Sequence, residues 1–490
     1  MAEHPVPPIG TAISRLAAED PDAPAVTCNG HTLTRAALDS TTNRLARAYA
    51  DLGVRQGDYV TIALPNSVQW VQAVVATWKL GAIPQPLSAR LPDTEYRHLL
   101  DLRPRALLVG RPDPRGVVPS VPGDFEPGPE VSDAALPEAV SPSIKSMASG
   151  GSTGRPKLIE AGVDGRFAGN LVAAMMGNLP TDTQLVSVPL SHNTGFTSAT
   201  TALATGQHLV LMDRFDPHEF LRLIAEYRVN YLATVPTIMQ RLLPVYRAGS
   251  YDLSSVTRWW HLAAPCPPTV KEAWIEILGP DAVWELYGGT ELQALTFISG
   301  AEWLTHRGSV GRVVAGEMTV LDDDGEECPP GVVGEIYMRP REGGKPTYRY
   351  IGSTAKTRDG WDSLGDLGCF DEDGYLYLAD RRVDMFTVGG RNVYPAEIEN
   401  ALSEHPAVLS CLVVGIPHED LGQVPHALVH TDDDLDHGAV TAFVAERLAE
   451  HKVPRSVEFV DIPLRDDAGK ARRTAVRDEV ISRLRAQADP

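Results

Sequence analysis

Hydrophobic and polar positions in the first part of the chain follow two alternating periods. Residues 58–66, DYVTIALPN, form an apolar run that ends in a turn, which is typical of a buried strand. Residues 67–83 carry apolar side chains at helical spacing up to Gly81, so we expect a helix there. A strand followed at once by a helix is the beginning of a parallel βαβ unit.

The same alternation returns further along the chain. Apolar segments that predict strands are residues 183–190, 208–215 and 230–236. Between the last two segments, Asp216 is placed to cap a helix that has Pro217 at its first position and Glu219 three residues after the cap. Repeated strand–helix–strand spacing predicts an α/β domain built from βαβ subdomains.

Other parts of the chain differ in composition and in hydrophobic periodicity. Residues 111–143 are rich in proline and glycine without periodicity, which predicts a surface excursion. From Gly311, short β-like segments with Asp-Gly turns predict a small antiparallel β region. A new helix–strand alternation starts near Arg381. We therefore expect a large N-terminal domain, residues 1–380, and a small α+β C-terminal domain, residues 381–490.

Composition excludes several classes of function. The chain has 490 residues and a net charge of −20, with 44 lysines and arginines against 64 aspartates and glutamates. This balance disfavours nucleic-acid binding and an anionic membrane surface, and an anionic substrate would need a local cationic pocket. The five cysteines form no Cys-x-x-Cys pair, so neither a disulfide framework nor a zinc site is indicated. No leader-like segment or long apolar run is present, so we expect a cytoplasmic protein without membrane insertion.

The segment SGGSTGRPK, residues 149–157, combines glycines, hydroxyls and two cations. It is not a Walker loop, because Arg155 and Pro156 follow Gly154, and Pro156 has no N–H with which to continue into a helix. A hydroxyl-rich cationic loop could close over a pyrophosphate and release it. Taken alone, the segment could equally be an ordinary Gly/Ser surface loop.

Four further segments give this loop a context. They are WELYGGTE (284–291), WDSLGDLGCFDEDGYLYLADRRVDM (361–385), VGGRNVYPAEIE (388–399) and DDAGKARR (466–473). In this order, and over nearly the whole chain, the segments resemble those of the adenylate-forming superfamily: acyl-CoA synthetases, luciferases and peptide-synthetase adenylation domains. The segments WWHLAAPCPP and ISGAEWLTHRGSVGRV resemble, more narrowly, bacterial ligases for bile acids and related acids.

The resemblance implies a two-step reaction. A carboxylate attacks the α-phosphate of ATP and releases pyrophosphate, and a thiol, expected to be that of coenzyme A, then displaces AMP. The implied fold is a large α/β domain with a small mobile C-terminal lid, and the active site lies between them. The expected protein is an AMP-forming acyl-CoA synthetase that uses ATP, Mg²⁺ and coenzyme A.

Residue by residue, the resemblance assigns the adenylation chemistry. Lys470 would bridge the substrate carboxylate and the α-phosphate, and Thr290 would donate to that phosphate. Glu291 would bind Mg²⁺, an ion that commonly takes one or two carboxylates plus phosphates. Asp366 would accept from the ribose hydroxyls, beside Arg381 as a donor. In isolation, Lys470 could be a solvated lysine and Asp366 a turn residue.

The remaining nucleotide contacts follow from the same resemblance. Tyr287 would stack on adenine beside Gly288, although a core aromatic is the alternative. The pyrophosphate loop would use Ser149, Gly150, Gly151, Ser152, Thr153, Gly154 and Lys157. Ala264, Pro265 and Glu285 complete the expected nucleotide site.

The C-terminal domain is expected to rotate between the two half-reactions. Gly389 and Gly390 would leave space for the pantetheine arm, and they would also suit a β-turn. Many relatives carry Lys or Asp where this chain has Val383, and valine is stiffer and uncharged. The sequence therefore leaves the exact pivot open.

The acyl pocket is the least determined part. His192 matches a gate of the acyl tunnel, with a core histidine as the alternative. Residues expected to line the pocket are His192, Phe196, Thr237, Trp259, Trp260, His261 and Gly288. An apolar lining favours a bulky hydrophobic acid: a steroid or diterpenoid acid first, a medium- or long-chain fatty acid second.

Two other hypotheses stay open. The acceptor could be a carrier protein or a nitrogen nucleophile instead of coenzyme A. A binding module without turnover is disfavoured because Lys470, Glu291 and Asp366 are all present. The expected partners are a small carboxylic acid, ATP and coenzyme A, and the chain is a candidate homodimer.

Overall fold

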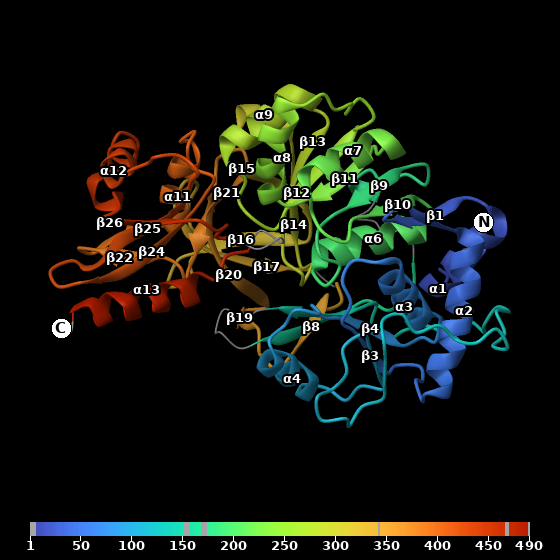
Figure 1. The fold of residues 1–490 in the computed structure, drawn as a ribbon. Coiled ribbons are helices and arrows are strands. Elements are labelled where there is room, and N and C mark those ends of the chain that lie inside the picture. Colours follow the sequence, from blue (N-terminus) through green and yellow to red (C-terminus); the bar gives the residue numbers. More distant parts are fainter. Residues whose placement is uncertain (1–5, 150–155, 168–173, 342–343, 466–469, 489–490) are drawn as a thin grey trace.

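The computed structural model describes residues 6–149, 156–167, 174–341, 344–465 and 470–488. Strands and helices up to Arg381 form a large body, and the residues that follow build a smaller body on a sheet of their own (Figure 1). This arrangement confirms the expected α/β class with a separate C-terminal domain. The exact boundary at residue 380 stays a prediction.

One long mixed sheet runs through the large domain, in the order β16–β17–β20–β21–β15–β14–β13–β12–β11–β9–β10–β1–β2. Its strands are β1 (Pro24–Cys28), β2 (His31–Thr34), β9 (Thr183–Val186), β10 (His208–Leu211), β11 (Tyr231–Thr234), β12 (Arg258–Leu262), β13 (Val283–Tyr287), β14 (Leu295–Ser299), β15 (Ser309–Ala315), β16 (Glu317–Leu321), β17 (Gly334–Arg339), β20 (Trp361–Phe370) and β21 (Leu376–Arg381). Strand β19 (Lys356–Arg358) pairs with β20.

The middle of this sheet is parallel, as the βαβ spacing predicted. Strands β10, β9, β11, β12 and β13 pair in parallel. The intervening helices are α6 (Asn193–Thr205), α7 (Pro217–Tyr227), α8 (Pro236–Ala248) and α9 (Pro268–Leu278). The predicted cap of α7 is confirmed, because the Asp216 side chain accepts from the Glu219 N–H at 2.9 Å and Pro217 is the first helical residue.

The strands after β13 pair antiparallel, which confirms the predicted antiparallel β region. A short helix, α10 (Gly300–Thr305), separates β14 from β15. Strand β20 lies beside β21 with Asp366 opposite Arg381. This register places two predicted site residues side by side.

The N-terminal part adds a helical layer and a small parallel sheet, seen at the lower right of Figure 1. The elements are α1 (Ile9–Glu19), α2 (Arg35–Asp51), α3 (Val68–Lys79), α4 (Asp93–Asp101), β3 (Tyr59–Ile62), β4 (Ile83–Pro86), β5 (Leu107–Val109) and β6 (Ser120–Val121). Helix α3 ends just before Gly81, whose φ of +65° suits glycine. Within the described part of residues 111–143, only β6 is regular.

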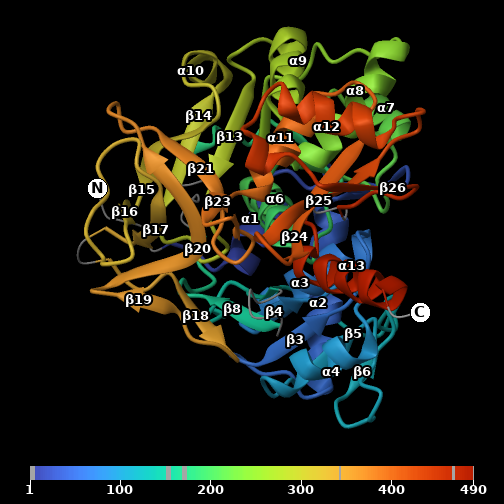
Figure 2. The same ribbon diagram turned by 90° about the vertical axis from the view of Figure 1, so that its left-hand side faces the viewer.

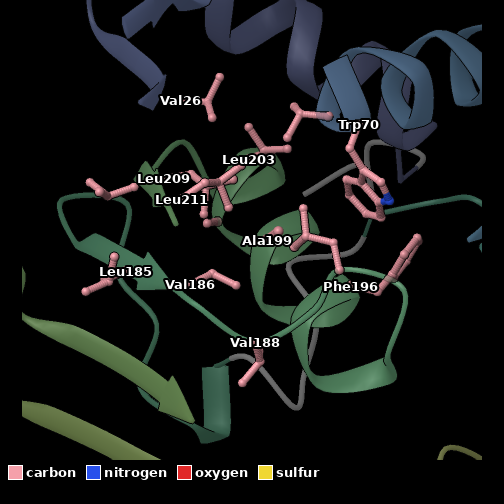
Figure 3. Close-up of a cluster of buried hydrophobic side chains, with 14 of the residues drawn as sticks. Val26, Trp70, Leu185, Val186, Val188, Phe196, Ala199, Leu203, Leu209 and Leu211 are labelled. Carbon is pink, nitrogen blue, oxygen red and sulfur yellow. The ribbon is translucent and has the colours of Figure 1, made fainter. Parts of the chain in front are cut away.

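The main hydrophobic core lies between the parallel strands and helices α3 and α6. Figure 3 shows Trp70 of α3 beside Phe196 of α6, with Leu185, Val186 and Leu209 of the sheet to their left. Both aromatic side chains are almost fully buried. This core fixes the sheet whose strand ends carry the site.

A separate small sheet has the strand order β18–β8–β7. Its strands are β7 (Ser146–Ser149), β8 (Lys157–Ala161) and β18 (Tyr348–Ile351). Strand β7 ends at Ser149, and β8 begins at Lys157 with the register Ser149–Lys157. The two ends of the glycine loop are therefore held together by a strand pair.

The C-terminal domain has its own sheet and helices, in orange and red at the left of Figure 1 and facing the viewer in Figure 2. Its elements are β22 (Phe386–Val388), β23 (Arg391–Val393), α11 (Pro395–Ser403), β24 (Ser410–His418), β25 (Gly422–His430), α12 (His437–Ala445), η1 (Glu450–Lys452), β26 (Ser456–Val460) and α13 (Arg473–Ala488). Its buried core is independent of the main core. Among the described residues, no helix is long and apolar enough to cross a membrane.

Candidate active site

The turn after β13 positions Glu291, the expected magnesium ligand. A Cβ at Gly289 would lie 2.6 Å from Glu291 Oε2, so a larger residue there would displace the carboxylate. Leu292 closes the turn with a φ of +52°, and its N–H donates to the Gly289 carbonyl at 3.1 Å. Glu291 is only 6% exposed. The Gly-Gly-Thr-Glu sequence therefore gives a tight turn that fixes one buried carboxylate.

Tyr287, Asp366 and Arg381 form a second group. The Tyr287 hydroxyl donates to Asp366 Oδ2 at 2.9 Å, and Arg381 Nε lies 3.2 Å from Asp366 Oδ1. Burial, followed by the Asp366 charge, raises the pKa of Tyr287 well above its usual value. The Asp366 charge likewise raises the pKa of Arg381. The predicted adenine and ribose residues thus contact one another.

Tyr350, which is not among the predicted site residues, contacts both Lys157 and Glu291. The Lys157 ammonium lies 3.4 Å from the centroid of the Tyr350 ring, and the Tyr350 hydroxyl donates to Glu291 Oε1 at 2.5 Å. Burial lowers the pKa of Lys157, while the Glu291 charge raises it and the Arg381 charge lowers it. Lys157, Glu291 and Arg381 therefore belong to one electrostatic cluster.

The other predicted contact residues surround this cluster in different ways. Gly288, Thr290, Ala264 and Ser149 are half-buried, and Pro265 is exposed. Ala264 and Pro265 follow Ala263, whose φ of +73° is rare for a residue with a side chain. Predicted loop residues Gly150, Gly151, Ser152, Thr153 and Gly154 lie outside the described residues. The roles of all these residues stay predictions.

Lys470 is exposed and lies just before α13 in the C-terminal domain. Gly389 and Gly390 lie at the hairpin turn between β22 and β23, with φ values of +55° and +80°. The turn interpretation of the glycine pair is therefore confirmed. That the two glycines leave space for the pantetheine arm, and that Lys470 bridges the carboxylate and the α-phosphate, stay predictions.

Two expected pocket residues belong to the core instead. Phe196 is 1% exposed and makes edge contacts with Trp70 and Trp78, at centroid distances of 5.7 and 5.9 Å. Trp259 is 0% exposed and packs on Trp274 at 4.6 Å. Both side chains are packed in helix-covered layers, and their place in the acyl pocket stays a prediction.

His261 and Glu285 are also enclosed, on the same side of the sheet as Trp259. The Lys271 ammonium of α9 donates to Glu285 Oε2 at 2.6 Å, and His261 Nε2 lies 3.8 Å from that oxygen. Burial, with Lys271 nearby, lowers the pKa of His261 well below its usual value. Glu285 thus forms a buried ion pair with His261 beside it, and the predicted contacts of the two residues with the nucleotide and the acid stay predictions.

His192 and Thr237 are half-buried, as access to a pocket requires. His192 is the residue before α6, and Thr237 is in the first turn of α8. Trp260, which is 0% exposed like Trp259, has the opposite orientation and joins an apolar cluster with Trp284 and Phe297, at 5.2 and 4.9 Å. These residues remain candidates for the acyl pocket.

The described residues suit a Mg²⁺ ion that the protein and the phosphates of ATP hold together. Glu291 is a single buried carboxylate beside Thr290, and the described residues contain no group of three or more His, Cys, Asp or Glu that could hold a metal. An all-protein cage is not what Mg²⁺ requires, since it is usually held by one or two carboxylates plus substrate phosphates.

Comparison with known proteins agrees with this geometry. Residues 13–343 match the AMP-binding enzyme family, and residues 397–470 match the C-terminal domain of AMP-binding enzymes. The 2-succinylbenzoate–CoA ligase of Bacillus licheniformis is 31% identical over 92% of this chain and 96% of its own length. A Mycobacterium tuberculosis ligase for 3-[(3aS,4S,7aS)-7a-methyl-1,5-dioxo-octahydro-1H-inden-4-yl]propanoyl:CoA is 30% identical over 96% of this chain and 98% of the relative.

Solved structures give the same result. The o-succinylbenzoate CoA synthetase of Bacillus subtilis in complex with its acyl-adenylate matches with a TM-score of 0.84 at 26% identity, covering 95% of this chain and 98% of the other. A double mutant of the same enzyme bound to a product analogue, OSB-NCoA, matches with a TM-score of 0.68 at 27% identity, again covering 95% and 98%.

The fold and the cluster at the strand ends define an adenylate-forming enzyme of two domains. The chain belongs to the AMP-binding enzyme family. It is an AMP-forming acid–thiol ligase, and the expectation of ATP, Mg²⁺ and coenzyme A as its cofactors is confirmed at the level of this class. The narrower resemblance to bile-acid ligases stays a prediction.

Proposed function

We propose that this ligase activates a bulky hydrophobic carboxylic acid as its adenylate and transfers the acyl group to coenzyme A. A steroid- or diterpenoid-like acid is the first expectation, and a medium- or long-chain fatty acid the second. The observation that carries the adenylation step is one cluster of contacts, in which Tyr350 contacts both Lys157 and Glu291, and Asp366 contacts both Tyr287 and Arg381.

The chain's own residues would divide the work of adenylation. Asp366 and Arg381 would hold the ribose, and Tyr287 would cover the adenine. Lys470 would offset the negative charge where the carboxylate and the α-phosphate meet, and Lys157 would offset the charge of the leaving pyrophosphate. Mg²⁺, when bound at Glu291, would neutralise part of the phosphate charge.

The choice of acid rests on two supports. The apolar cluster of Trp260, Trp284 and Phe297 lies on β12–β14, and the middle one of these strands, β13, ends at Tyr287 of the site. Both relatives named above act on ring-containing acids, one aromatic and one a bicyclic ketone. An apolar wall with few charges fits such a ring system.

The order of steps is supported by the domain arrangement. The chain matches the adenylate complex of the Bacillus subtilis enzyme better than the product-analogue complex, with TM-scores of 0.84 and 0.68 over the same share of the chain. In this arrangement Gln240 of α8 donates to the Leu409 carbonyl of the C-terminal domain at 2.9 Å. Both observations support assigning this arrangement to the first half-reaction.

Mass spectrometry of the products tests the proposal. Purified protein is incubated with ATP, Mg²⁺ and a panel of steroid, diterpenoid, aryl and fatty acids, with and without coenzyme A. An acyl-CoA ion with a steroid, diterpenoid or fatty acid, and AMP formed in step with it, is expected. An acyl-CoA ion with aryl acids alone would overturn the substrate class. An adenylate that accumulates and ignores coenzyme A would overturn the acceptor and point to a carrier protein or a nitrogen nucleophile.

A further inference from the structure

Tyr350 reaches the site from a strand far away in the sequence. Strand β18 pairs antiparallel with β8, and Tyr350 lies opposite Ile159. Lys157 is two residues before Ile159 on β8, so its side chain leaves the same face of the sheet. This register brings the ammonium over the tyrosine ring, at 3.4 Å from the centroid.

The hydroxyl end of the same ring contacts the other charge. Tyr350 Oη donates to Glu291 Oε1 at 2.5 Å, so the ammonium lies over the ring face while the carboxylate lies at the ring edge. Glu291 Oε2 points toward Gly289. The tyrosine thus stands between a cation and an anion that would otherwise attract each other directly.

We propose that Tyr350 is a positioning residue that keeps Lys157 and Glu291 apart and orients both for ATP and Mg²⁺. The proposal rests on the proposed function, since Lys157 and Glu291 are its phosphate and metal groups. The ring holds the ammonium through a cation–π contact, leaving it available to phosphate oxygens. The hydroxyl holds one carboxylate oxygen and orients the other, the effect that partners of metal ligands commonly have.

A neighbouring tyrosine provides a matched control. Tyr348 leaves the same face of β18, 4.8 Å from Tyr350 between ring centroids, and is also half-buried. Its hydroxyl donates to Asp362 Oδ2 at 2.8 Å, an oxygen that Gln293 also contacts. Removal of the Tyr348 hydroxyl removes a similar hydrogen bond, which it donates to Asp362 and not to Glu291.

Isothermal titration calorimetry of ATP binding, in the absence of any acid and at a series of Mg²⁺ concentrations, measures how Tyr350 affects the binding of Mg²⁺ and ATP. For Tyr350→Phe we expect the Mg²⁺ concentration of half-saturation to rise about tenfold, with Mg²⁺-free ATP affinity unchanged, because only the carboxylate loses its partner. For Tyr350→Leu we expect a larger rise and weaker Mg²⁺-free ATP binding, because Lys157 then pairs with Glu291. Tyr348→Phe should match the wild type.

Two results of this calorimetric titration would overturn the proposal. One is a Tyr350→Phe protein with the Mg²⁺ dependence of the wild type. The other is an equal shift in Tyr350→Phe and Tyr348→Phe, which would show a general packing effect.

A crystal structure of Tyr350→Leu supplies a readout that needs no nucleotide. The expected result is a Lys157 Nζ–Glu291 carboxylate contact within about 4 Å, the range of an ion pair. Groups that stay apart in that structure would refute the separating role. A wild-type protein that binds no ATP would count against the proposed function and would leave this structural outcome to decide the role of Tyr350.

Discussion

The ion pair between Lys271 and Glu285 is expected to be a main determinant of the stability of the large domain. Lys271 is 0% exposed on α9 and Glu285 is 6% exposed on β13, and their charged atoms are 2.6 Å apart. His261 is the other titratable ring near Glu285, and burial holds its pKa far below neutrality. Lys271 is therefore the cation that compensates this carboxylate.

The size of the effect follows from this burial. In Lys271→Met, the side-chain volume is nearly kept while the charge is lost, and Glu285 stays enclosed. Breaking a buried ion pair by removal of one partner costs about 3–5 kcal/mol, whereas replacing both partners with apolar residues is often neutral or stabilising. We therefore expect Lys271→Met to lose about 3–5 kcal/mol, and Lys271→Met/Glu285→Leu to recover most of that loss.

Urea unfolding followed by tryptophan fluorescence measures this loss in the right domain. All eight tryptophans lie between Trp70 and Trp361, so the signal does not depend on residues 381–490. Arg222→Met is the control, because Arg222 pairs with Glu219 and Glu226 at the surface, where ion pairs contribute about 0–1 kcal/mol. A Lys271→Met protein within about 1 kcal/mol of the wild type, or a double variant as unstable as the single one, would refute the reasoning.

Two further predictions concern the C-terminal domain and its junction. Lys470→Ala should lower adenylate formation by orders of magnitude and largely spare thioester formation from preformed adenylate, with Lys452→Ala as control; equal loss in both half-reactions would contradict the role. Burial raises the pKa of Asp380 to about 6, above its unfolded value of about 3.9, so the folded state binds the extra proton and stability should rise as pH falls from about 6 to 4. In Asp380→Asn, the free energy of unfolding at pH 4.5 relative to that at pH 7.5 should be about 2 kcal/mol lower than in the wild type, because the extra proton is no longer bound. Urea unfolding followed by circular dichroism at the two pH values measures this change, and the same pH dependence in both proteins would contradict the prediction.

Local patterns predicted the elements and the motif residues well. The parallel strands follow from apolar runs, and the start of α7 follows from Asp216 and Pro217, because both signals are encoded within a few residues. Asp366 and Arg381 meet because their strands are consecutive and pair in a hairpin register. Such contacts need little knowledge of the tertiary structure.

Contacts between distant segments were not predictable in this way. Trp259 and Trp260 are adjacent and both apolar, yet one faces α9 and the other joins the Trp284 cluster, because parallel strands are buried on both faces. Lys271 occupies a helix where a lysine ordinarily indicates a solvated face. Tyr350 reaches Lys157 only through the β18–β8 pairing. No local signal distinguishes these residues from ordinary ones.

The junction between the domains explains how Val383 can replace a charged pivot residue. On one side, the Arg382 N–H donates to the Gly365 carbonyl at 2.9 Å, and its guanidinium contacts Asp323 at 2.6 Å in the large domain. On the other side, Asp384 lies 3.3 Å from Arg473 of the C-terminal domain. Val383 is 53% exposed between them. The partners therefore change from one domain to the other at this residue, and its charged neighbours carry the anchoring contacts. A rotation of the lid about Val383 would need no charge at the pivot, because the ion pairs of Arg382 and Asp384 each stay on one side of it. The bonds that would change are those that the Asp384 and Met385 N–H groups donate to the Arg381 carbonyl.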